Sequence, residues 1–385
     1  MQGIGVARYQ ALDGLRGIAA CVVLIHHCCL VSPELAEAVD SNGRGTFEPW
    51  TWWTVFSPLH LFWAGQEAVF VFFILSGFVL TLPRLRGRPQ SWPAYYCKRI
   101  ARIFPPVWAS LGLAVITVWI APRIADPDLS SWVNKHQEPT NAFIDGALLF
   151  GASSLNSPLW SLRWEVLFSL LLPMFCIGVC RFRQAWMLRM AGLLMTIGLG
   201  DILEEDVLVF LPMFGLGVLM ASHVEVLSAW AAKFRSSTWC GLLTVTLIFL
   251  LSRWILPGIP AANALSAVGG VLLLFMFVGS KGTSMIGSAP ALQWLGKLSF
   301  SLYLTHEPVV VSVALVTHSD EPVVVGLIAV PLSIALAVAF SALVERPSLR
   351  LASTVGDLVD KTSWRPRLWS QGRESRIQNK EPSRN

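Results

Sequence analysis

Charged residues are scarce in this chain. Asp, Glu, Lys and Arg make up 14% of its 385 residues, whereas soluble globular domains contain about 25%. Hydrophobic residues reach 54%, and the mean hydropathy is +0.58. A soluble fold of this size cannot bury so much apolar sequence. The composition therefore excludes an ordinary soluble protein and predicts an all-α, polytopic membrane helix bundle.

Patterns that would indicate other classes of protein are also missing. The seven cysteines lie in apolar runs or beside basic loops rather than in the long polar loops, which argues against a disulfide framework. We find no Cys or His spacing typical of a metal site, no P-loop, no GxGxxG motif and no internal repeat. We therefore expect no metal, no permanently bound cofactor and no nucleic-acid partner. The first apolar run carries charges and lacks a small-residue cleavage site, so it is not a cleavable signal peptide.

Long apolar runs are abundant. Windows of about 19 residues predict about ten transmembrane helices, near residues 12–31, 60–82, 102–121, 159–180, 186–200, 206–222, 239–256, 263–280, 298–317 and 323–344. If the N-terminus is cytoplasmic, 24 of the 29 Lys and Arg residues fall on the inner side. Because basic residues concentrate in cytoplasmic loops, we expect both termini in the cytoplasm and a multi-pass protein of the cytoplasmic (inner) membrane.

The same reading divides the chain into a membrane domain, residues 1–350, and a flexible basic cytoplasmic tail, residues 351–385. Two segments, 32–59 and 122–158, are long enough to form structure outside the membrane. The tryptophans at 50, 52 and 53 are typical of interfacial anchors, but they would also suit stacking on a sugar-like acceptor.

The first apolar segment contains ionisable residues, which are costly in a bilayer and usually mark function. Arg16 and His27 are eleven residues apart, so they differ by only about 20° around a helix and by about 16 Å along it. Asp13 lies about 40° from that line, whereas His26 points about 80° away from Arg16. One polar stripe with Arg16 and His27 is therefore expected.

Basic and acidic residues also mark the third and fourth segments. Arg99 and Arg102 neighbour each other on a helix and match the geometry of phosphate groups, although an ordinary positive-inside loop has the same composition. Glu165 lies inside an apolar run and needs a partner or a role. His306 and Glu307 lie within the ninth segment, where Pro308 interrupts regular hydrogen bonding.

Taken in order, these residues resemble the motifs of the membrane acyltransferase-3 family over about residues 9–350. The motifs are Asp13-Gly-Leu-Arg16-Gly with His27, Phe72-Phe-Ile-Leu-Ser76-Gly-Phe78, Arg99-x-x-Arg102-x-x-Pro105, Trp160-Ser-Leu-x-x-Glu165, Gly296-x-x-Ser299-x-Ser-x-Tyr303-Leu-x-His306-x-Pro308 and Glu345-Arg-Pro347. Arg163, Trp164 and Thr305 depart from the residues common in the family, which leaves the acceptor open.

The resemblance implies an integral-membrane O-acyltransferase. Such enzymes transfer an acyl group, often acetyl, from cytoplasmic acyl-CoA to hydroxyl groups of carbohydrates, glycolipids or related natural products. On this basis His27 is the expected general base or acyl carrier, with Arg16 and Glu165 as further catalytic residues. Arg99 and Arg102 are expected to bind the phosphates of acyl-CoA. Trp160 and Ser161 are candidate substrate-binding residues, and Glu165 is expected to orient the acceptor or the histidine.

Two other classes of protein use similar residues. A proton-coupled transporter of a small polar solute also places Arg, His and Glu within the membrane, but it predicts inverted repeats, which the sequence does not show. A scaffold or acyl-relay protein would need the helices but not the arginine pair.

Overall fold

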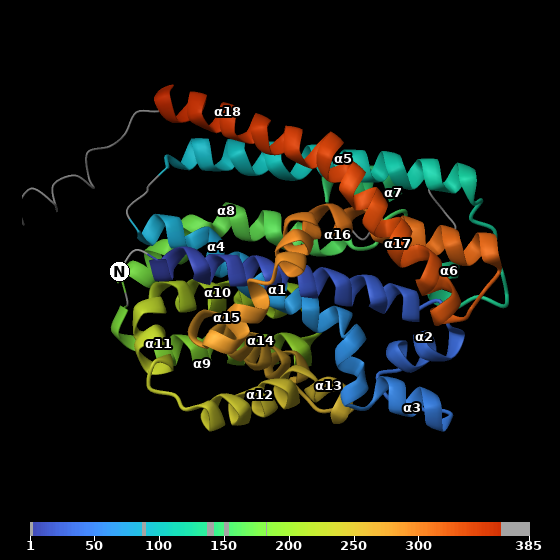
Figure 1. The fold of residues 1–385 in the computed structure, drawn as a ribbon, viewed down its shortest axis with the longest axis horizontal. Coiled ribbons are helices and arrows are strands. Elements are labelled where there is room, and N and C mark those ends of the chain that lie inside the picture. The colour runs from blue at the N-terminus through green and yellow to red at the C-terminus, as the bar shows by residue number, and fades with distance from the viewer. Residues whose placement is uncertain (1–2, 87–89, 137–141, 150–153, 182, 363–385) are drawn as a thin grey trace, which may run out of the picture.

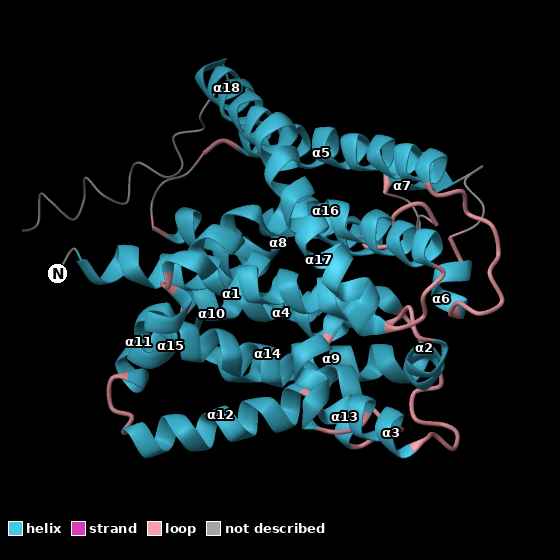
Figure 2. Ribbon diagram, turned by 45° about the vertical axis from the view of Figure 1, so that its right-hand side comes forward, coloured by secondary structure: helices cyan, strands magenta, loops and turns pink. Residues whose placement is uncertain are grey.

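The computed structural model describes residues 3–86, 90–136, 142–149, 154–181 and 183–362. All regular secondary structure in these ranges is helical (Figure 2). The longer helices are α1 (Gly3–Cys29), α4 (Gly65–Leu85), α5 (Trp92–Ile120), α8 (Leu159–Arg181), α9 (Trp186–Leu203), α10 (Asp206–Ser222), α12 (Ser236–Leu250), α14 (Ala262–Gly279), α16 (Pro290–Thr317), α17 (Pro322–Phe340) and α18 (Arg346–Thr362). The predicted all-α membrane bundle is therefore confirmed.

Each of the ten predicted segments overlaps one of these helices, but α10 and α12 are short. Eight helical stretches in the described ranges are long and apolar enough to cross a bilayer, and α10 with α11 (Val224–Ala231), bent by 71°, makes a ninth. Helix α12 has 15 residues, about 22 Å at 1.5 Å per residue, which is less than the hydrocarbon thickness of about 30 Å. The count by length thus falls short of ten because of α12.

Helices α1 and α16 run side by side in the same direction, although they lie at opposite ends of the chain (Figure 1). Gly17 lies against Gly296, and ten residues further along each helix His27 lies against His306. A Cβ atom at Gly17 would be 2.7 Å from the backbone nitrogen of Gly296, so only glycine permits this spacing. This close contact brings the histidines of the two helices together.

Aromatic side chains pack against one another within the largely aliphatic core of the bundle. Phe73 of α4 stacks on Phe214 of α10, with ring centroids 4.7 Å apart, and Phe168 of α8 stacks on Phe214 at 4.5 Å. These rings are buried, and aromatic pairs of this kind contribute beyond their apolar area. They fix α4, α8 and α10 relative to one another.

Short helices cover the end of the bundle at which α1 ends (Figures 1 and 2). They are α2 (Pro33–Asp40), α3 (Pro49–Val55), η1 (Pro58–Trp63), α6 (Ser131–Asn134) and α13 (Ser252–Ile255). The segments 32–59 and 122–136 supply most of them, as expected for loops with structure of their own. The exposed Trp50, Trp52 and Trp53 lie in α3.

The C-terminal segment differs from the expected flexible tail. After a π-helical turn, η3 (Ser341–Glu345), the chain continues as α18 and packs along α5. The side of α18 that is buried consists of Ser348, Ala352 and Gly356, spaced four residues apart, and Lys98 of α5 pairs with Asp357 at 3.0 Å. Small residues at this spacing let two helices approach closely. Residues 363–385 of the predicted tail lie outside the described residues.

Candidate active site

The site is centred on two histidines from α1 and α16. Nδ1 of His27 lies 2.7 Å from Nε2 of His306, and Nδ1 of His306 lies 2.9 Å from the carbonyl oxygen of Leu302. A carbonyl only accepts hydrogen bonds, so His306 carries its proton on Nδ1 and accepts at Nε2. His27 must then donate from Nδ1. With both rings neutral, this network leaves Nε2 of His27 as an unprotonated nitrogen, the form that a general base requires.

His26 points to a different part of the molecule. Its Nδ1 lies 2.9 Å from the carbonyl oxygen of Trp63, and its ring lies against Gly65. The two neighbouring histidines therefore have separate surroundings, as their angular separation on the helix predicted.

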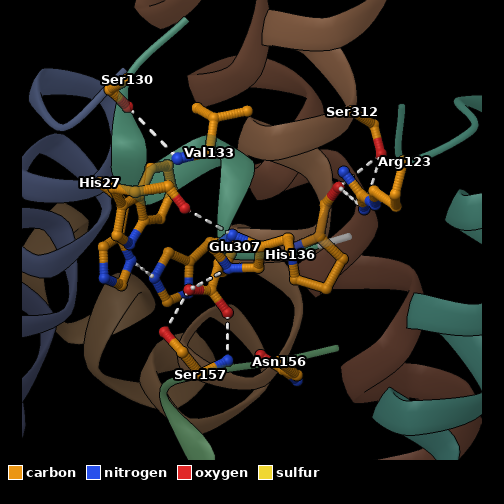
Figure 3. A network of polar contacts seen from close by, with 12 residues as sticks. His27, Arg123, Ser130, Val133, His136, Asn156, Ser157, Glu307 and Ser312 are labelled. Carbon is orange, nitrogen blue, oxygen red and sulfur yellow. Dashed lines mark hydrogen bonds and ion pairs between the residues drawn. The ribbon is translucent and has the colours of Figure 1, made fainter. Parts of the chain in front are cut away.

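Helix α6 lies beside His27; Figure 3 shows this helix near Ser130 and Val133. Trp132 lies nearly parallel to the imidazole of His27, with ring centroids 5.2 Å apart and an interplanar angle of 14°. Ser130 donates to the carbonyl oxygen of Leu30 at 2.6 Å, which ties the start of α6 to the end of α1. Both residues are half-buried, so Trp132 shields one face of the His27 imidazole.

Two contacts at the ends of α5 and α16 hold the chain that leads into α6. The hydrogen bond from Nδ1 of His318, 2.9 Å from Asp126, holds the pKa of that carboxyl below its usual value. Arg123 donates to Thr117 at 3.2 Å, and burial lowers the pKa of Arg123 to about 10, against an opposing effect of Glu307.

A second polar cluster, formed by His136, Ser157 and Glu307, adjoins the pair of His27 and His306. Glu307 is fully buried and accepts hydrogen bonds from the backbone nitrogen and the hydroxyl of Ser157 (Figure 3). Nε2 of His136 lies 3.1 Å from Glu307, while Nδ1 of His136 lies 2.8 Å from the carbonyl oxygen of Trp132. Both partners of His136 are acceptors, so the ring must donate from both nitrogens or Glu307 must hold a proton. In either case a proton lies between His136 and Glu307.

Glu165 does not contact the histidines. Its carboxylate lies 2.5 Å from Nη2 of Arg99, and Nε of Arg99 donates to Ser169 at 3.1 Å. The expectation that Glu165 orients His27 is therefore wrong: in the structure, His306 holds His27, and Glu165 pairs with Arg99. The alternative, that Glu165 orients the acceptor, stays a prediction. Sequence spacing indicated that Glu165 needs a partner but carried no information on which one.

A pocket lies along α1 and α16, on the side of Tyr303 away from the end of α1. Its polar lining comprises Arg16, Ser76, Arg102, Ser161, Glu165, Ser299 and Tyr303. The hydroxyls of Ser161 and Tyr303 are 2.7 Å apart, and the Tyr303 ring centroid is 5.9 Å from that of His306. Tyr303 thus stands between the pocket and the histidine pair.

The remaining predicted residues lie beside the pocket rather than in it. Trp160 packs against Phe210, with ring centroids 5.1 Å apart, and against Phe73. Glu345 accepts a hydrogen bond from Ser301. Neither Trp132 nor His136 was predicted to lie in the site, because an isolated Trp and an isolated His in a polar loop give no periodic signal. His306 was part of a predicted motif but had no predicted role.

The chain was compared with known proteins. A family model described as an acyltransferase domain, that of the acyltransferase-3 family, matches residues 9–344. The chain belongs to this family. The match runs from within α1 to beyond the end of α17, so the histidine pair and the arginine pocket both lie within the acyltransferase domain of a multi-pass membrane protein. No curated protein and no solved structure matches the chain.

Proposed function

We propose that the protein transfers an acyl group, acetyl in the simplest case, from cytoplasmic acyl-CoA to a hydroxyl group of a carbohydrate, glycolipid or related natural product. Acyl-CoA is a substrate here, not a bound cofactor. Membership of the acyltransferase-3 family supports acyl transfer in general. The hydrogen-bond order around His27 is the observation that carries the proposal.

In this mechanism Nε2 of His27 removes the proton from the acceptor hydroxyl. The resulting oxygen nucleophile attacks the thioester carbonyl, the carbon–sulfur bond breaks, and the departing thiolate of CoA takes the proton back from His27. His306 keeps Nδ1 of His27 in use as a donor, so that Nε2 is the nitrogen available to the hydroxyl. Trp132 lies over the ring and would stabilise the imidazolium that forms in this step.

The donor occupies the arginine pocket, with its phosphates at the end of α1 that the positive-inside pattern assigns to the cytoplasm. Arg16 and His27 are separated by about 16 Å along α1, and an extended pantetheine arm bridges a gap of this kind. The apolar side chains of Phe72, Phe73 and Phe300, which also line the pocket, suit an uncharged arm. The acceptor approaches His27 from the end of the bundle that α6 covers. The protein itself lies in the cytoplasmic (inner) membrane.

Two variants of neighbouring residues test the role of His27. His27→Ala should abolish thiol release from acetyl-CoA in the presence of an acceptor, with a loss on the order of 10²-fold or more. His26→Ala is the matched control, because it removes an imidazole one position away that contacts Trp63 instead. If His27→Ala is correctly inserted and releases thiol as fast as His26→Ala and the wild type, His27 is not the base.

A further inference from the structure

Helix α16 contains a proline at the turn that carries His306. Pro308 has no backbone N–H, so it cannot donate to the carbonyl oxygen of Leu304 four residues earlier, and the proline ring crowds that carbonyl. Leu304 and His306 are both buried. An unsatisfied carbonyl inside a membrane bundle is costly. The turn therefore needs a donor from outside the helix.

The missing donor comes from the segment that precedes α8. Nδ2 of Asn156 donates to the carbonyl oxygen of Leu304 at 2.8 Å, and the Asn156 side chain is fully buried. The amide nitrogen must face this carbonyl, because the amide oxygen can only accept. Nδ2 also lies 3.4 Å from the hydroxyl of Ser110 in α5. Asn156 thus supplies, from another part of the chain, the hydrogen bond that Pro308 removes from the helix.

The next two residues of this segment also contact α16. The backbone nitrogen and the hydroxyl of Ser157 donate to Glu307 (Figure 3). The carbonyl oxygen of Pro158 accepts a hydrogen bond from the Tyr303 hydroxyl at 3.1 Å. Three consecutive residues before α8 therefore hold three residues of about one helical turn, and His306 lies within that turn.

We propose that Asn156 is a positioning residue, which fixes the turn of α16 that presents His306 to His27. The inference rests on the proposed function, because it takes His27 as the base. Since Pro308 removes one of the hydrogen bonds of this turn, its geometry depends on the segment 156–158 and not on the helix alone. The 2.7 Å contact between the two histidines is sensitive to a small rotation of the turn, and misplacement by about 1 Å can be costly to catalysis.

A double-mutant cycle between Asn156 and Pro308 tests this assignment without any substrate. Pro308→Ala restores a backbone N–H that can donate to Leu304, so the helix no longer needs the amide. In mixed SDS micelles, Asn156→Ala should raise the unfolding equilibrium constant about tenfold in the wild-type background, but less than about threefold when Pro308→Ala is present. If Asn156→Ala alone does not fold, the double variant should restore folded protein. Equal losses in both backgrounds, or no such restoration, would overturn the assignment.

Asn263 supplies the matched control for this cycle. Its side chain is also an amide donor, but it lies in α14 and donates to Asp201. Asn263→Ala should therefore destabilise the protein by the same factor with and without Pro308→Ala.

Kinetics separate a positioning role from a purely structural one. Asn156→Asp keeps the size of the side chain but replaces the amide donor by a second oxygen. Asn156→Asp and Asn156→Ala should each lower kcat for acyl transfer on the order of tenfold, and the pH profile of kcat should shift as it does in His306→Ala, because the same contact is disturbed. An unshifted profile, or full activity of Asn156→Asp, would show that Asn156 does not position the histidine pair.

The two measurements also distinguish this inference from the proposed function. If the wild type transfers acyl groups but Asn156 and Pro308 are not coupled in unfolding, the inference fails and the proposed function stands. If the coupling is present but the wild type transfers no acyl group, the hydrogen bond of Asn156 has its assigned role in α16 and the proposed function fails.

Discussion

The imidazoles of His27 and His306 share a hydrogen bond of 2.7 Å although 279 residues separate them in the chain. The parallel contact of α1 and α16 makes this possible, and the carbonyl oxygen of Leu302 sets the proton order through both rings. His306 thus orients His27. In other enzymes, too, a neighbouring side chain holds the general base in the required orientation. This relationship gives His306 a role that its position in a sequence motif did not reveal.

Replacement of His306 should therefore impair catalysis without removing the base. His306→Ala leaves Nδ1 of His27 without its acceptor, so either nitrogen can carry the proton, and kcat should fall on the order of 10²-fold. His306→Gln keeps a carbonyl that can accept from His27, and it should restore part of the loss. The measurement is kcat and KM for acetyl-CoA, with the pH profile of kcat for each variant.

A purely structural role of His306 gives a different result. In that case His306→Ala and His306→Gln would lose activity in proportion to their loss of folded protein, and the pH profile of the remaining activity would match that of the wild type. A shifted profile with an unchanged melting temperature supports orientation of His27.

The pairing of His136 with Glu307 should matter more for stability than for the chemistry. Both side chains are buried, and removal of one leaves the other without its partner, which is costly in the interior. We expect His136→Ala and Glu307→Ala each to destabilise the protein and their effects to be non-additive, with a coupling energy of about 1–3 kcal/mol. Unfolding of the four members of this double-mutant cycle in mixed SDS micelles measures the coupling.

Asp128 supplies the control for that cycle. It lies in the same loop, but it is exposed, so Asp128→Ala should change the free energy of unfolding by no more than about 0.5 kcal/mol. Additive effects of His136→Ala and Glu307→Ala would show that the two side chains do not share a proton.

Much of the fold followed from local sequence patterns. Long apolar runs predicted the helices of the bundle, because a helix in a bilayer satisfies its own backbone hydrogen bonds and needs no partner. Helical geometry also placed Arg16 and His27 on one side of α1, which the structure shows facing the pocket and His306. The ordered motifs indicated the acyltransferase-3 family, and the family comparison confirms it.

The pairings between distant residues could not be predicted in the same way. Glu165 and Arg99 are 66 residues apart, and the spacing of residues within one helix says nothing about such a contact. Helix α18 was missed because its buried residues, Ser348, Ala352 and Gly356, are small and only weakly apolar. A hydropathy window does not register a contact made by close backbone approach. Both kinds of contact depend on how helices pack, not on the composition of any one of them.

The contact between α1 and α16 gives the last prediction. A Cβ atom at Gly296 would overlap the carbonyl oxygen of Asp13, and backbone on both sides leaves nothing flexible to move. Gly296→Ala should therefore separate the helices, lower the yield of folded protein and reduce acyl transfer by displacing His306 from His27. Gly241→Ala is the control, because Gly241 lies within α12 and a methyl group added there would meet no described atom within 4 Å. Alanine favours helices over glycine by about 1 kcal/mol, so Gly241→Ala should match or exceed the wild type in thermal stability. If both substitutions are tolerated equally, close packing at Gly296 does not hold the histidine pair together.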